Sequence, residues 1–491
     1  MTFNSWEFLL FYPIVLLLYF VLPKKCKWPM LLIASYYFYM CYQAELVFLI
    51  LGTTFISWAA SNIIEKSEKP AVRKLCLTVT LVVCLGVLFF YKYFNFLAGS
   101  VTGLIAYFGG TPSQVALNLI LPVGVSFYTF QTLSYVIDVY RGDIKTERNF
   151  FFYALFVSFF PQLVAGPIER PGNLMPQLKE PKPWNRADAV KGAKHMIVGF
   201  FKKVCVADIL SLYVNEIYND VSSASALGVI IATALFAIQI YCDFSGYTDI
   251  AIGCARVMGI RLMKNFDHPY TATTIKEFWS RWHISLSTWF KDYLYFPLGG
   301  SRCKKPRHLF NLFVVFLVSG LWHGAAWTYV IWGAIHGVYQ IVGNLTIKSR
   351  NRLLVKMKLS EKSLPVVILR RVGVFVLVCF AWLFFRANSM SDAVVLLKSL
   401  FVTGWDVGLT DALRSMNLIS TETGPTPLFI CLFSILILIM IDKALKYDDE
   451  EGASYLLLSR GSFVYFIWII MFAWAILLSQ DIASTFIYFQ F

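Results

Sequence analysis

The stretch Leu-Phe-Asn-Leu-Phe-Val-Val-Phe-Leu-Val-Ser-Gly-Leu-Trp-His-Gly-Ala-Ala-Trp, residues 309–327, decides the fold class of this chain. It approaches the ~20 apolar residues that a helix needs to cross the hydrocarbon core of a bilayer. It contains His323 but no Asp, Glu, Lys or Arg. The stretch therefore predicts a membrane helix, and His323 becomes a functional candidate because ionisable groups are costly inside a membrane.

Comparable apolar windows recur along all 491 residues. They cover residues 8–23, 46–63, 75–90, 115–137, 150–168, 224–241, 309–327, 328–345, 372–385, 428–441 and 463–478. Solid apolar blocks differ from the alternating segments of ~10 residues that build membrane β-barrels. The sequence thus predicts an all-α polytopic membrane protein with about ten to thirteen membrane-embedded helices, some of them re-entrant.

The composition excludes a soluble enzyme. Hydrophobic residues make up 58% of the chain and charged residues only 15%, whereas a soluble domain carries roughly 25% charged residues. Aromatic residues, at 17%, outnumber the charged ones. Much of the surface of this protein must therefore face lipid.

Positive charge is concentrated in a few short segments. The 43 Lys and Arg exceed the 29 Asp and Glu, giving a net charge of +14. By the positive-inside rule the basic clusters are cytoplasmic; they lie at 24–27, 66–74, 141–148, 170–194, 302–307 and 348–371. The loops 109–114 and 403–427 are expected outside. A cytoplasmic position of the basic clusters, in contact with anionic lipid, accounts for the net positive charge. We therefore expect no nucleic-acid partner.

The longest polar stretch divides an otherwise continuous membrane domain spanning 1–491. We expect N-terminal helices over 1–168, then a cytoplasmic loop and interfacial helix over 169–223, whose amphipathic run includes Lys202, Lys203 and Asp208. A core over 224–345 and C-terminal helices over 346–491 would follow.

Polar residues that belong to membrane-depth segments concentrate between about 240 and 340. Asp243 and Ser245 lie in Tyr-Cys-Asp-Phe-Ser-Gly-Tyr-Thr-Asp, residues 241–249, directly after an apolar window. Residues 277–293 are too polar for a lipid-facing helix and too aromatic for an ordinary loop. Irregular backbone at membrane depth is tolerated only where it lines protein or water, so a re-entrant or cavity-lining helix is expected here.

Three of the six histidines, His283, His323 and His336, lie in this zone. A histidine in a dry site stays neutral, because burial disfavours imidazolium, and a neutral imidazole can accept a proton from a hydroxyl. On one helix the 13 residues from His323 to His336 would rotate the chain by about 220°, so the two need not share a site. Packing histidines remain an alternative for all three. We expect no metal site, because there is no His-x-x-x-His pair, and no Gly-x-Ser-x-Gly nucleophile elbow occurs.

The segment Phe-Trp-Ser-Arg-Trp-His-Ile-Ser-Leu-Ser, residues 278–287, followed by Leu-Trp-His-Gly at 321–324, resembles the membrane-bound O-acyltransferase (MBOAT) family. In that family a His, Asn or Asp precedes an invariant His by about forty residues. Four further segments resemble the bacterial alginate O-acetyltransferase (AlgI-like) branch: 121–131, 160–170, 239–249 and 295–302. The resemblance covers roughly residues 1–345 in the family's order.

The resemblance implies helices around a transmembrane tunnel, with 224–345 as the catalytic core. His323 matches the invariant histidine and would act as the base, and His283 matches the second family position. The remaining tunnel or substrate-binding residues implied are Asp243, Ser245, Arg281, Trp282, Trp322 and His336. An acyl thioester such as acetyl-CoA would be a donor substrate, with no permanently bound cofactor and no metal.

The expected function is therefore O-acetylation of a cell-envelope or extracellular polysaccharide by a multi-pass protein of the bacterial inner membrane. Membrane lipid, the cytoplasmic donor, a polysaccharide or protein hydroxyl and an extracytoplasmic SGNH-type acyltransferase are the implied partners. A teichoic-acid D-alanyl transferase fed by a carrier-protein thioester is the nearest alternative. A transporter or flippase would use the embedded acids and histidines as a relay, but the paired repeats typical of transporters are not evident. A non-catalytic scaffold would give the polar residues no purpose.

Overall fold

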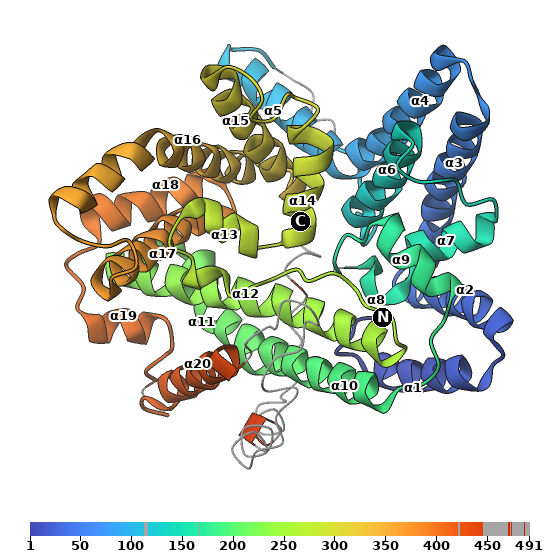
Figure 1. Cartoon of the computed structure of the whole chain (residues 1–491). Coiled ribbons are helices and arrows are strands. Elements are labelled where there is room, and N and C mark those ends of the chain that lie inside the picture. The colour runs from blue at the N-terminus through green and yellow to red at the C-terminus, as the bar shows by residue number, and fades with distance from the viewer. Residues whose placement is uncertain are drawn as a thin grey trace. The chain divides into compact units, whose positions relative to one another are not determined.

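The computed structural model describes residues 1–111, 116–164, 166–420 and 423–444, together with 470, 471, 473 and 486 (Figure 1). Regular structure throughout these ranges is helical, and their only β-type pairing is an isolated bridge between Ser420 and Gly424. The all-α prediction is confirmed.

The described helices follow one another closely along the chain. In order, the α-helices are α1 (Trp6–Val21), α2 (Lys24–Met40), α3 (Val47–Lys66), α4 (Pro70–Leu88), α5 (Phe94–Tyr107), α6 (Val125–Arg141), α7 (Phe150–Ser158), α8 (Phe160–Leu163), α9 (Pro171–Lys179), α10 (Arg186–Phe200), α11 (Ile209–Asn219), α12 (Ala226–Val257), α13 (Ile275–Arg281), α14 (Ile284–Phe290), α15 (Lys305–His323), α16 (Trp327–Lys356), α17 (Leu364–Arg386), α18 (Met390–Lys398), α19 (Leu409–Ser415) and α20 (Thr426–Ala444). The π-helical segments are η2 (Phe89–Tyr93), η3 (Phe201–Asp208), η6 (Lys291–Tyr295) and η7 (Ser399–Thr403). The short 3-10 turns are η1 (Ala44–Leu46), η4 (Val221–Ser223) and η5 (Pro269–Thr271).

Five described helical segments are long and apolar enough to cross a membrane: Ala44–Lys66, Pro70–Tyr107, Ala226–Val257, Trp327–Lys356 and Leu364–Arg386. The expected windows 46–63, 75–90, 224–241, 328–345 and 372–385 fall on them. Helix α1 and residues 426–441 are apolar but shorter. The window 463–478 lies outside the described residues except for 470, 471 and 473. The chain is a membrane protein by this measure.

Two expected windows are displaced in the structure. Helix α15 begins at Lys305, with Pro306 in its first turn, and ends at His323, four residues before the expected end at 327. Because its first turn is basic, α15 is not among the five helical segments that are long and apolar enough to cross a membrane. In the window 115–137, the described residues from 116 onward become helical only at Val125, directly after Gly124, which adopts a left-handed backbone with φ of 72°. A side chain at Gly124 would also meet the carbonyl oxygen of Leu163.

The described chain divides into two compact units, which interleave along the sequence. One comprises residues 1–196 and 247–263, and the other comprises 197–246 and 264 onward. In the first unit, α3 presents a buried row of hydroxyl side chains, Thr53, Thr54, Ser57 and Ser61. Each bonds a carbonyl one turn earlier in the same helix, which satisfies it in an apolar setting. Ser57 also pairs with the hydroxyl of Tyr153 at 2.9 Å.

A buried carboxyl group ties two loops of the first unit together. Glu169 is fully buried and accepts hydrogen bonds from the backbone N–H of Met263 at 2.5 Å and from the Asn173 amide at 2.7 Å. Burial raises the pKa of Glu169 to about 7, against the opposing effect of these hydrogen bonds. The group therefore carries or loses its charge close to neutral pH.

In the second unit, α15 and α16 form a close antiparallel hairpin (Figure 1). Gly320 and Gly333 face each other across it: a Cβ on Gly320 would lie 2.4 Å from the Tyr329 carbonyl oxygen, and one on Gly333 would lie 2.5 Å from that of Phe316. Small residues at a helix crossing allow the two backbones to approach in a membrane protein. This hairpin positions the candidate active site.

Candidate active site

His323 is the last residue of α15, and its side chain is only 3% exposed. The helix ends there because Gly324 takes extended backbone, and no larger residue fits at 324: a Cβ would lie 2.1 Å from the Tyr329 ring. Aromatic rings surround the imidazole, with centroids 5.0 Å away for Trp322, 4.9 Å for Trp332 and 5.6 Å for Phe385. The lone histidine of the apolar stretch is thus held in a buried aromatic cage.

His283 lies at the N-terminus of α14 and is fully buried. Its φ of 45° is left-handed, a conformation that few residues with a side chain adopt. Asn265 fixes the backbone beside it: the Asn265 carbonyl accepts the N–H of Ile284 at 2.9 Å, and its side-chain oxygen accepts the Ser285 hydroxyl at 2.9 Å. The strained turn is therefore supported from a separate loop.

The two histidines expected to be catalytic lie close together. Their ring centroids are 6.4 Å apart. Trp322 lies 5.8 Å from the His283 ring, and Phe244 of α12 packs edge-on against it at 4.6 Å. Side chains from α12, from the N-terminus of α14 and from the end of α15 thus meet at one buried position.

His336 lies on α16, a different helix from His323, so the rotation expected for a single helix does not apply. Trp332 lies between the two histidines, with centroid distances of 4.9 Å to His323 and 5.0 Å to His336. The Trp279 indole N–H donates to Nδ1 of His336 at 3.2 Å. Since Nδ1 accepts, the proton of a neutral His336 ring is on Nε2. The hairpin therefore gathers both histidines around one tryptophan.

Asp243 belongs to a buried ion-pair network that the amphipathic pattern did not indicate. Its carboxylate lies 2.6 Å from Nζ of Lys203, and Asp208 lies 2.8 Å from the same nitrogen. All three side chains are at most 5% exposed. Burial alone would lower the pKa of Lys203, but the Asp243 and Asp208 carboxylates outweigh it and raise that pKa. Lys203 and Asp208 lie on the π-helical segment η3, a kind of irregularity frequent at functional sites.

The remaining candidates take different places. Ser245 is buried, and its hydroxyl has no hydrogen-bond partner among the described residues. Trp282 packs into a second aromatic group, stacking on Phe278 at 5.5 Å and contacting Trp382 at 5.2 Å. Arg281 instead pairs with Glu277 at 2.6 Å and is about one-third exposed.

Metal-ligating residues are not clustered in the described ranges, where no three His, Cys, Asp or Glu side chains lie close enough to hold an ion. A buried neutral imidazole can take a proton from a hydroxyl, and a second ring within reach can stabilise developing charge.

Comparison with known proteins agrees with this chemistry. A sequence model of the MBOAT, membrane-bound O-acyltransferase family matches residues 143–386, which include His283, His323 and His336. The chain is 38% identical over 436 residues to a probable alginate O-acetylase AlgI of Pseudomonas aeruginosa, covering 86% of this chain and 79% of that protein. It is 33% identical over 421 residues to a peptidoglycan O-acetyltransferase of Helicobacter pylori, covering 79% and 77%.

A third relative is more distant. A teichoic acid D-alanyltransferase of Bacillus subtilis is 30% identical over 288 residues, covering 56% of this chain and 71% of that protein. With these similarities beside the helical fold, the chain belongs to the membrane-bound O-acyltransferase family. It is an O-acyltransferase, and its greater similarity is to the O-acetylating relatives.

Proposed function

We propose that this protein moves an acetyl group from a cytoplasmic thioester across the membrane to O-acetylate a cell-envelope or extracellular polysaccharide. The buried pair His283 and His323, 6.4 Å apart, is the observation that carries this proposal. Two relatives that match most of the chain, from Pseudomonas aeruginosa and Helicobacter pylori, are named for O-acetylation of alginate and of peptidoglycan.

In the proposed reaction His323 is the general base. It takes the proton of the acceptor hydroxyl as the oxygen attacks the thioester carbonyl, and the new C–O bond forms. The C–S bond then breaks, and the imidazolium returns the proton to the leaving thiolate. His283 would donate a hydrogen bond to the oxyanion, since a centroid separation of 6.4 Å is about two hydrogen-bond lengths.

The surrounding candidates would bind substrate. Asp243, Ser245, Trp322 and His336 would line the acyl path next to the two histidines. Trp282 would support the path from its aromatic group, and Arg281 would act near the entrance, consistent with its partial exposure. The donor would be acetyl-CoA or another acyl thioester, with no permanent cofactor. The basic clusters expected at the cytoplasmic side suit a phosphate-bearing donor.

The proposed setting is the bacterial inner membrane, which the protein would cross several times. An extracytoplasmic SGNH-type acyltransferase would accept the acetyl group where transfer is relayed. Alginate, peptidoglycan and other polysaccharides are the acceptors to compare. D-Alanyl transfer remains the second candidate because of the similarity to the Bacillus subtilis enzyme over 288 residues.

The test is donor turnover by purified protein in proteoliposomes with radiolabelled acetyl-CoA. We expect His323→Ala to lower thioester consumption by about 10²–10⁴-fold, the range for loss of a general base. His308→Ala is the matched control, since His308 lies on the same helix but near its other end. Equal turnover by His323→Ala and wild type would refute the assignment. Turnover of a carrier-bound D-alanyl thioester but not of acetyl-CoA would identify the second candidate.

A further inference from the structure

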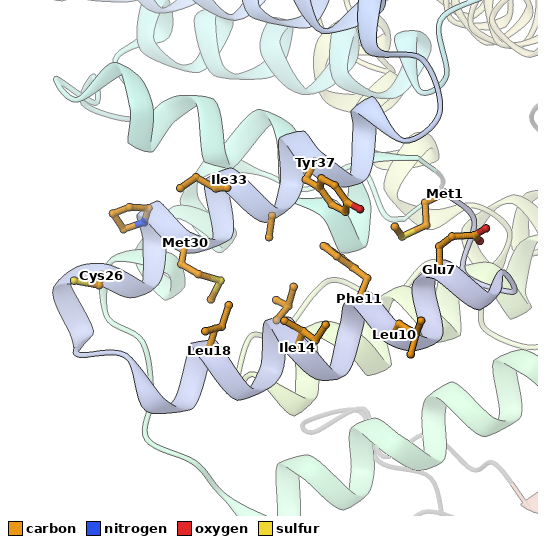
Figure 2. A pocket seen from close by; sticks show the side chains of 13 residues that line it. Met1, Glu7, Leu10, Phe11, Ile14, Leu18, Cys26, Met30, Ile33 and Tyr37 are labelled. Atoms are coloured by element: carbon orange, nitrogen blue, oxygen red, sulfur yellow. The ribbon is translucent and has the colours of Figure 1, made fainter.

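A long apolar groove runs between α1 and α2 in the first unit (Figure 2). Its volume is about 840 Å³, within the ~300–1,000 Å³ typical of sites for small ligands. Leu10, Ile14 and Leu18 line it from α1, and Met30 and Ile33 line it from α2. The groove is therefore large enough for a molecule and almost wholly hydrocarbon in character.

Three of the lining side chains are strongly exposed, with 71% of Leu10, 57% of Ile14 and 71% of Ile33 accessible. Such a patch in water would mark a binding surface or a site of aggregation. In a membrane protein, apolar exposure favours the hydrocarbon part of a lipid. Helix α1 has 16 residues and is about 24 Å long, so the groove suits an extended chain better than a compact ligand.

The two ends of the groove differ in the charged side chains near them: Glu7 lines one end, and Lys24 and Lys25 precede Cys26 at the other. Figure 2 shows Leu18, Met30 and Cys26 at one end, and Glu7 with Met1 at the other. Cys26 directly follows the exposed residues Lys24 and Lys25 in the first turn of α2. Lys27, the next residue, is buried, with its ammonium 4.5 Å from the Tyr19 ring centroid. A ligand with an apolar chain and an anionic head thus fits the groove with its head at the Cys26 end, near Lys24 and Lys25, and its chain extending toward Glu7.

We propose that the α1–α2 groove binds an anionic glycerophospholipid, with an acyl chain along Leu10, Ile14 and Ile33 and its phosphate at Lys24 and Lys25. Basic pockets beside membrane helices at the cytoplasmic face recognise anionic headgroups, and this end of the groove is the expected cytoplasmic one. Charge complementarity selects a lipid over a second copy of the chain, because a copy of net charge +14 would not favour a basic rim. The bound lipid would be a structural ligand of the first unit and is distinct from the acyl-donor substrate.

The test is native mass spectrometry of the full-length protein after delipidation, with dioleoyl phosphatidylglycerol or dioleoyl phosphatidylcholine added back. We expect preferential retention of one phosphatidylglycerol. Ile14→Trp fills the groove and should abolish retention. Leu17→Trp should leave it unchanged, because Leu17 is 65% exposed on the same helix but does not line the groove.

A second variant keeps the groove open. Lys24→Gln with Lys25→Gln should weaken phosphatidylglycerol binding roughly thirtyfold, since each lysine near an anionic headgroup contributes a factor of about five. These exposed residues carry little folding risk. Equal retention of both lipids, or phosphatidylglycerol retention by Ile14→Trp, would overturn the proposal. A dimer that Ile14→Trp disrupts, with no lipid preference, would assign the groove to a second copy instead and would also overturn it.

Discussion

Replacing Lys203 by Met should destabilise the second unit more than any exposed lysine substitution. The ammonium of Lys203 lies within 2.8 Å of two carboxylates, those of Asp243 and Asp208, and all three groups are almost completely buried. Met matches the length of the side chain without its charge. The variant therefore leaves two buried carboxylates with one cation fewer.

The magnitude follows from the cost of a buried charge that loses its partner. Removing one member of a buried ion pair costs about 3–5 kcal/mol, because the remaining charge stays out of water. The shared position of Lys203 between two acids places this variant at the upper end of that range. At about 2 °C per kcal/mol, the lower slope typical of larger proteins, a cost near 5 kcal/mol should lower the melting temperature by roughly 10 °C.

The assay is the loss of the monodisperse peak in size-exclusion chromatography after heating the detergent-solubilised protein. Lys276→Met is the control, because Lys276 is exposed on α13 of the same unit, and its effect should stay within about 0.5 kcal/mol. Adding Asp208→Asn to Lys203→Met should recover part of the loss. A fall below 2 °C for Lys203→Met, or no recovery in the double variant, would refute the reasoning.

Three further predictions concern other buried positions. His283→Asn should fold about 1 kcal/mol better than His283→Ala, since Asn tolerates the left-handed backbone; thermal stability compares them. Gly320→Ala should lower acyl transfer about 10²-fold by displacing His323, while Gly343→Ala, with open space on α16, should not; equal rates would contradict this. Relative to Glu169→Gln, wild type should lose about 3 kcal/mol as pH rises from about 4.5 to 7, because in this range the carboxyl is ionised in the unfolded chain while the folded state, with its pKa raised to about 7, still holds the proton. Parallel stability curves for wild type and Glu169→Gln would exclude that pH effect.

The apolar windows predicted both the helical class and the candidate histidines. Windows of this length indicate membrane helices, and an ionisable group inside such a helix is costly. A lone histidine in an apolar stretch is rare because it is costly, so His323 could be singled out without knowledge of its neighbours. Its aromatic cage could not be predicted, since Trp332 and Phe385 come from other helices. The family resemblance, confirmed by the comparisons, supplied what hydrophobicity could not.

Lys203 and Asp208 show the limit of local patterns. Both lie in a run that looks amphipathic, and that pattern predicts an interfacial helix with charges in water. Asp243, the second carboxylate that pairs with Lys203, is forty residues beyond that lysine, and only the fold brings it near. The end of α15 was misplaced for a similar reason: Gly324 takes extended backbone and ends the helix, at a position where the Tyr329 ring, five residues later, leaves no room for a side chain.

The left-handed backbone at His283 also bears on how this active site can change during divergence. A position with φ of 45° admits Gly readily and, among residues with side chains, favours Asn, Asp and His. Those last three are the residues that the family resemblance admits at this position. The left-handed backbone thus restricts position 283 to a few residue types, and the requirements of catalysis apply only among these. Lineages can exchange imidazole, amide and carboxylate here while the turn that carries them stays the same.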